Sequence, residues 1–136
     1  MIQRIQTLYI VIAVLFIISA RIWFPVVLDE NGIAIMDANE PLAIGLMAVA
    51  ALAALLALFN YKNRPRQIIL NRSSMLLQII LLGVFAYRSL TLSGEIQFSE
   101  KGIGVIFPII SIVFLWMANK AIKRDEDLVK SVDRLR

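Results

Sequence analysis

The sequence predicts an all-α membrane protein: a four-transmembrane-helix bundle with a small extracytoplasmic β cap and a cytoplasmic C-terminal helical extension. Hydrophobic residues make up 60% of its 136 residues, against about 45–50% apolar residues in soluble domains. Four stretches also lack Asp, Glu, Lys and Arg, and these are Ile5–Ala20, Pro41–Phe59, Met75–Tyr87 and Ile103–Ala118. About 20 apolar residues suffice for a helix to cross a bilayer. We therefore expect one domain, 1–136, with helices over 2–24, 41–60, 65–92 and 102–136.

The charges between these stretches predict which loops face the cytoplasm. The two termini and the segment 60–72 together carry eleven bases and four acids, a net charge of +7. The other two connections carry three bases and six acids, a net charge of −3, and the two values give the +4 of the whole chain. Short loops rich in Lys and Arg stay in the cytoplasm. Both termini are therefore expected in the cytoplasm.

The first helix is expected to end or kink at Pro25, because proline removes a helix hydrogen bond. A cleaved signal peptide is the alternative, since Ile18-Ser19-Ala20 resembles a weak cleavage site. Apolar residues resume directly at Ile22-Trp23-Phe24, which favours a retained helix. Asn31-Gly32 then lies between two β-branched runs, a hairpin signal whose alternative is an irregular loop. The period-two segment 95–99 is expected to add a strand to this cap.

The second helix begins at Pro41, which suits a first helical turn. Its middle carries small residues at helical spacing, which allow close helix contact in lipid, within one bundle or between copies; they are Ala48, Ala50, Ala51, Ala53, Ala54 and Ala57. The third helix is less apolar, and Arg72 and Arg88 near its ends are expected to reach opposite interfaces. The alternative is a polar niche between helices, lined by Asn71, Ser74 and Gln78.

The fourth helix is expected to continue past the membrane, because no Gly or Pro follows Pro108. Lys123–Asp127 and Glu126–Lys130 place opposite charges at i,i+4 spacing. The tail also has a narrow apolar face, which is formed by Ile122, Leu128, Val129, Val132 and Leu135. The tail is therefore expected to be a cytoplasmic helix that lies on the membrane or against a partner.

Catalysis is not expected of this composition. The chain has no Cys and no His, so thiol redox chemistry, disulfides and the usual zinc or haem ligands are excluded. No P-loop or dinucleotide fingerprint occurs, and every carboxylate is expected outside the membrane. We expect no enzyme activity, no cofactor and no bound metal. The basic turn is better explained by membrane topology than by nucleic acid.

The start MIQRIQTLY, the turn FNYKNRPRQ and the ending ANKAIKRDEDLVKSVDRLR resemble a family of small bacterial membrane proteins, domain of unknown function family 4293. The likeness covers essentially the whole chain and is most specific at the ending. It implies a four-span inner-membrane protein of Bacteroidota-type bacteria and no particular activity. The polar residues that carry it all fall on the predicted cytoplasmic side, where the resemblance would place a binding surface; they include Gln3, Arg4, Gln6, Asn60, Lys62, Asn63, Gln67, Asn119, Glu126, Asp133 and Arg134.

These observations favour a non-catalytic accessory or scaffold subunit that docks a protein partner through its cytoplasmic face. A small oligomeric channel or transporter and an anionic-lipid-binding protein are the alternatives, and a homo-oligomer stays open. The expected partners are membrane lipids and a protein, with no nucleic acid. The candidate residues for partner or lipid contact are Arg64, Arg66, Arg72, Asn71, Gln78, Asp125, Val129, Val132, Asp133 and Arg134.

Overall fold

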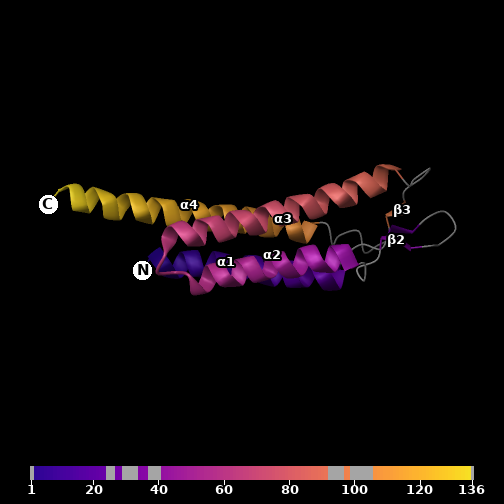
Figure 1. Ribbon diagram of the computed structural model, residues 1–136, viewed down its shortest axis with the longest axis horizontal. Helices are drawn as coiled ribbons and strands as arrows, with labels where there is room; N and C mark the ends of the chain where they lie inside the picture. The colour runs from indigo at the N-terminus through magenta and orange to yellow at the C-terminus, as the bar shows by residue number, and fades with distance from the viewer. Residues whose placement is uncertain are drawn as a thin grey trace.

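The computed structural model of the chain describes residues 2–23, 27–28, 34–36, 41–91, 97–98 and 106–135. Its four helices are α1 (Ile2–Trp23), α2 (Pro41–Phe59), α3 (Arg64–Thr91) and α4 (Ile106–Arg134) (Figure 1). The first three begin and end within one residue of the predicted bounds. The described part of the fourth begins at Ile106, and its predicted start at 102 lies outside the described residues.

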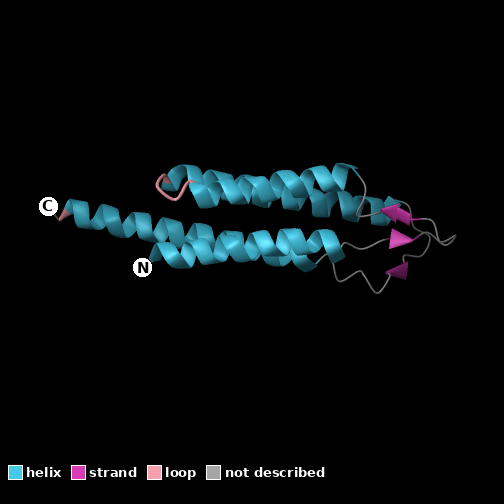
Figure 2. Cartoon of the chain, turned by 90° about the horizontal axis from the view of Figure 1, so that it is seen from below, coloured by secondary structure: helices cyan, strands magenta, loops and turns pink. Residues whose placement is uncertain are grey.

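The helices form two antiparallel pairs that pack side by side. The most extensive contacts join α1 to α4 and α2 to α3, and further contacts between α1 and α2 and between α3 and α4 complete the bundle. Figure 2 shows the α2–α3 pair above the α1–α4 pair. Both chain termini and the α2–α3 turn lie at one end of the bundle (Figure 1). We call this end, which includes Arg4, the turn 60–63 and α4 beyond Ala118, the terminal end.

Among the described residues, three short strands lie at the opposite end of the bundle (Figure 2). They are β1 (Val27–Leu28), β2 (Ala34–Met36) and β3 (Gln97–Phe98), ordered β2-β1-β3 with both pairings antiparallel. The predicted Asn31-Gly32 turn lies outside the described residues. Strands of two or three residues do not establish a folded cap on their own, so the extracytoplasmic cap stays a prediction.

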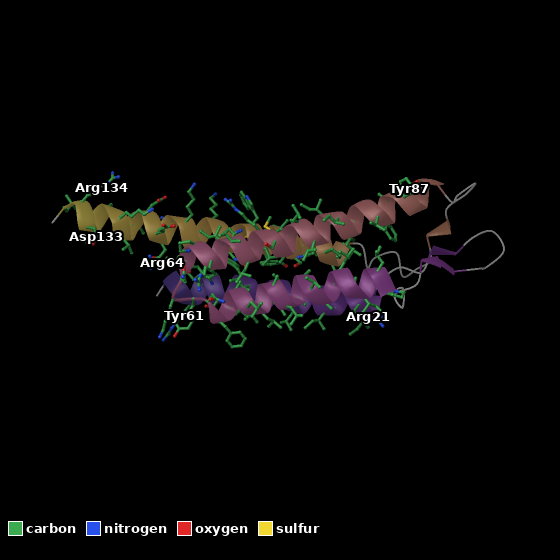
Figure 3. The ribbon with its side chains drawn as sticks, viewed as in Figure 1. Arg21, Tyr61, Arg64, Tyr87, Asp133 and Arg134 are labelled. Atoms are coloured by element: carbon green, nitrogen blue, oxygen red, sulfur yellow. The ribbon has the colours of Figure 1, made fainter. Side chains whose placement is uncertain are left out.

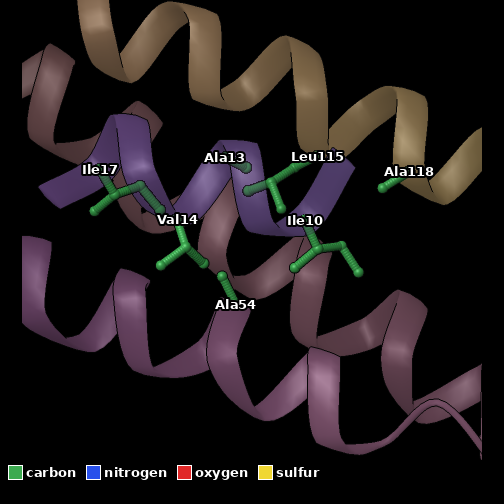
Figure 4. Packing of buried hydrophobic residues seen from close by; sticks show 7 residues of the cluster. All are labelled: Ile10, Ala13, Val14, Ile17, Ala54, Leu115 and Ala118. Carbon is green, nitrogen blue, oxygen red and sulfur yellow. The ribbon is translucent and has the colours of Figure 1, made fainter. Parts of the chain in front are cut away.

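The centre of the bundle is an apolar cluster formed by three helices (Figure 4). Inward positions of α1 recur at spacings of three and four residues, as the helical repeat requires. The buried members are Ile10, Ala13, Val14, Ile17, Ala54, Leu115 and Ala118. Of the six alanines that the sequence singled out in α2, four are buried, and these are Ala50, Ala53, Ala54 and Ala57. The small residues of α2 therefore contribute to packing within this bundle, whereas Ala48 is exposed.

The outer surface of the bundle carries many large apolar side chains. Leu15, Leu52 and Ile79 are each more than half exposed, and they belong to three different helices. Such large exposed apolar areas are unusual on soluble monomers, whereas lipid tails cover them without cost. Within the described residues, four helices are long and apolar enough to cross a membrane. The chain is therefore a multi-pass membrane protein.

Candidate functional site

A line of polar side chains runs along the inner face of α3. Gln67, Asn71, Ser74 and Gln78 follow one another at spacings of four, three and four residues, so they share one face of the helix. Each is at most 2% exposed. We call these four residues the polar stripe. It contains the three residues of the predicted polar niche and adds Gln67, while Arg72 lies on the exposed side of the helix.

Hydrogen bonds join the polar stripe to both neighbouring helices. The Ser74 hydroxyl donates to the Ala50 carbonyl oxygen of α2 over 2.8 Å. The Asn71 Nδ2 donates to the Asn119 Oδ1 of α4 over 2.9 Å. Amide and hydroxyl bonds between membrane helices contribute on average about 0.6 kcal/mol each. The stripe therefore helps to hold α2, α3 and α4 in register.

The polar interior also contains atoms that form no hydrogen bond among the described residues. These buried atoms are Asn71 Oδ1, Gln78 Oε1 and Gln6 Nε2. Gln78 is held weakly, since its Nε2 lies 3.4 Å from both the carbonyl oxygen and the hydroxyl of Ser74. Buried polar atoms without a partner destabilise a fold and commonly mark a functional or hydrated position. The stripe thus retains capacity for two further acceptor bonds.

Gln6 and Gln67 lie at the terminal end, but not where the family resemblance would place a binding surface. Their side chains are only 4% and 2% exposed, so they face the interior of the bundle. An inward position explains this burial, because Gln6 lies one helical turn before the buried Ile10 and Gln67 one turn before the buried Asn71. The spacing to an inward residue is the signal that could have identified them.

An ion pair connects the start of α3 to α4 at the terminal end. Arg64 Nη2 lies 2.8 Å from Asp125 Oδ2, and the two side chains are 24% and 13% exposed. Among the candidate cations, Arg64 is therefore already paired with an acid. Arg66 and Arg72 are exposed and form no ion pair within the described residues. Figure 3 shows Arg64 beside α4, with Tyr61 on the far side of the turn.

Beyond Ile122, the last buried residue of α4, the helix leaves the bundle. We call residues 123–135 the extension. It carries four exposed apolar residues, Leu128, Val129, Val132 and Leu135, which we call the apolar stripe. Leu128, Val132 and Leu135 are spaced by four and three residues and so lie on one face. Asp133 and Arg134 are exposed near its tip (Figure 3).

The candidate residues therefore fall into three separate places. Asn71 and Gln78 lie inside the bundle, Arg64 and Asp125 join the turn to α4, and the remaining candidates are exposed. In the described part of the chain, no three His, Cys, Asp or Glu side chains are grouped closely enough to hold a metal ion. The candidate residues that the structure describes therefore do not converge on one site.

Three comparisons with known proteins identify the family of the chain. No curated protein and no solved structure matches it. A family model described as "Domain of unknown function (DUF4293)" matches residues 2–135, which is nearly the whole chain. The chain therefore belongs to this family of unknown function.

Proposed function

We propose that the protein is a non-catalytic accessory or scaffold subunit of a bacterial inner membrane, and that its extension docks a protein partner in the cytoplasm. The observation that carries this proposal is the apolar stripe on a helix continuous with a membrane span. At 59% and 89% exposure, Val132 and Leu135 touch little of their own chain. Aliphatic side chains in this position favour cover by another surface.

The direction of the extension favours a protein partner over the membrane surface. α4 is one uninterrupted helix of 29 residues, and its extension continues roughly along the bundle (Figure 1). From Ile122 to Arg134 the helix rises about 18 Å. A helix that continues a membrane span in this direction enters water, and it cannot also lie flat on the lipid headgroups. Its apolar stripe is therefore available to a protein.

Charge favours the cytoplasm as the side where docking takes place. The exposed cations Arg66, Arg72, Lys120 and Lys123 all lie towards the terminal end. Segments next to membrane spans with an excess of Lys and Arg stay in the cytoplasm. The Arg64–Asp125 ion pair supports a docking role, since it fixes the base of the extension against the α2–α3 turn.

A channel or transporter is the second candidate, favoured by the buried acceptors Asn71 Oδ1 and Gln78 Oε1. Polar groups inside a membrane protein often mark a path for a solute. However, the polar stripe is enclosed by the packed helices of a single chain, with Ser74 and Asn71 fully buried. A path along it would require the helices to separate or several chains to assemble.

A substitution pair tests the docking proposal. Val132→Asp places a charge on the apolar stripe, whereas Lys130→Asp places the same carboxylate about 160° away around the helix. After purification in a mild detergent, the mass of the native complex is measured for both variants. We expect Val132→Asp to release a bound protein of different mass and Lys130→Asp to retain it. A wild-type protein that carries only copies of itself and conducts solutes in liposomes would instead support the channel.

A further inference from the structure

A groove opens between α1 and α4 at the terminal end, close to the level where the last buried residues of α4 occur. Its volume is about 630 Å³. One wall is apolar and aromatic, and the other carries two cations. The residues that line it are Ile5, Tyr9, Trp116, Met117, Lys120, Ala121, Arg124 and Leu128. A cavity of this size holds a drug-sized group, so one lipid headgroup and the start of an acyl chain fit.

Four of these residues form a column along one face of α4. Trp116, Lys120, Arg124 and Leu128 follow one another at i,i+4 spacing, which places them one above the other. The Lys120 ammonium lies 5.3 Å from the centroid of the Trp116 ring, an attractive cation–π contact. The column thus runs from an aromatic residue through two adjacent cations to an aliphatic residue.

The two cations carry charge that no neighbouring acid neutralises. Among the described residues, neither Lys120 nor Arg124 forms an ion pair. The nearest acids in the sequence are engaged elsewhere, since Asp125 pairs with Arg64 and Glu126 with Lys130. Asp127 is exposed and lines an adjoining hollow together with Lys120, Lys123 and Arg124, but it forms no ion pair with them within the described residues. The groove therefore complements an anion.

We propose that this groove binds an anionic phospholipid from the leaflet at the terminal end. Arg124 donates two parallel hydrogen bonds to oxygens of the headgroup phosphate, the geometry that guanidinium groups favour. Lys120 supplies the second positive charge, and Ile5, Tyr9 and Trp116 contact the first carbons of an acyl chain. Trp and Tyr are enriched at this depth of a membrane. A zwitterionic headgroup fits less well, because its own cation is repelled by Lys120 and Arg124.

This assignment moves the lipid contact away from the residues that the sequence suggested. Arg64 is held by Asp125 at 2.8 Å, so its charge is already neutralised. Arg66 lies in the first turn of α3 and does not line the groove. The groove combines cations with an apolar wall, and this combination distinguishes a lipid from a free anion. The inference does not require the docking role of the apolar stripe, although Leu128 belongs to both surfaces.

Native mass spectrometry in detergent tests the proposal, with phosphatidylglycerol and phosphatidylcholine as probes. We expect the wild-type chain to bind one phosphatidylglycerol in preference to phosphatidylcholine. The double variant Lys120→Gln/Arg124→Gln should bind phosphatidylglycerol about 30-fold more weakly. Lys62→Gln/Arg66→Gln is the matched control, because it removes one Lys and one Arg at the same end outside the groove. It should bind within about twofold of wild type.

Three results would overturn the proposal. Equal binding of the two lipids would identify ordinary surrounding lipid, and equal losses in the two double variants would identify general surface charge. Displacement of phosphatidylglycerol by inorganic phosphate would show that the groove recognises a free anion. The variant Arg124→Lys guards against loss of folding, because it preserves charge and helix propensity. We expect it to bind about fivefold more weakly than wild type, and unchanged affinity would contradict the bidentate contact.

Discussion

Arg64 Nη2 and Asp125 Oδ2 lie 2.8 Å apart and join the start of α3 to α4 at the base of the extension. Both side chains are largely shielded from water, so solvent weakens this pair less than it weakens an ordinary surface pair. The pair restrains the base of the extension from the side. The apolar stripe beyond it is therefore carried by a helix whose direction is set by the bundle.

Breaking this ion pair is expected to loosen the extension while leaving the bundle folded. Arg64→Gln should lower the free energy of unfolding by about 1 kcal/mol and should raise amide hydrogen exchange in residues 125–134. Lys130→Gln is the matched control, because it breaks the exposed Glu126–Lys130 pair within the extension itself. Such a pair contributes roughly 0.3–0.5 kcal/mol. If amide hydrogen exchange in residues 125–134 is equal in the two variants, Arg64 does not restrain the extension.

The Asn71–Asn119 hydrogen bond is expected to couple α3 to α4. Replacing either residue with Leu removes a bond of 2.9 Å and leaves the other amide without its partner, which costs about 1 kcal/mol. The double variant Asn71→Leu/Asn119→Leu should cost no more than either single change, because no amide is then left alone. Unfolding in mixed micelles measures the three values. If the loss of stability in the double variant equals the sum of the losses in the two single variants, the two residues do not interact.

Two adjacent serines of α3 provide a test of the inward face. The Ser74 hydroxyl bonds to α2, whereas the exposed Ser73 hydroxyl bonds to the Ile69 carbonyl oxygen of its own helix. Ser74→Ala should destabilise the protein by about 0.6 kcal/mol or more, and Ser73→Ala should change its stability by less than about 0.5 kcal/mol. The same unfolding assay serves both. A larger loss of stability in Ser73→Ala than in Ser74→Ala would mean that Ser73, and not Ser74, faces the interior of the bundle.

The orientation in the membrane can be tested with single cysteines, because the chain has none of its own. The positive-inside rule places Asn63 in the cytoplasm and Asn31 outside. Cysteine at position 31 should react in intact cells with a thiol reagent that does not cross the membrane. Cysteine at position 63 should react only after the cells are opened. Labelling of both positions in intact cells would refute the predicted topology.

Much of the fold could be predicted because the bilayer imposes simple rules on sequence. Charge-free stretches of 13 to 19 residues mark the spans, and flanking residues extend them towards the roughly 20 that a bilayer requires. Pro41 marks the start of α2 where the structure has it. Continuity of α4 followed from the lack of Gly and Pro after Pro108. These are local properties of the chain, so no tertiary information was needed.

The arrangement of the polar residues could be predicted only in part. Three polar residues interrupt the apolar third helix, and these are Asn71, Ser74 and Gln78. The sequence leaves open whether they line a polar niche between helices or whether Arg72 and Arg88 simply reach the two membrane interfaces. Gln6 and Gln67 occur near helix ends, where polar residues are common. Their spacing to Ile10 and Asn71 indicates an inward position only once those two residues are known to be buried. The Asn71–Asn119 bond joins residues 48 positions apart. Pairings of this kind depend on which helices become neighbours.

Site-specific photo-crosslinking in intact cells tests the docking proposal most directly. A photoreactive residue at Val132 lies on the apolar stripe, and the same residue at Lys130 lies about 160° away around the helix. We predict that Val132 forms one discrete adduct with a protein of different mass and that Lys130 does not. The docking proposal would be contradicted by equal adducts at both positions or by no adduct at Val132. It would also be contradicted by an adduct at Val132 with only a second copy of this 15.3 kDa chain.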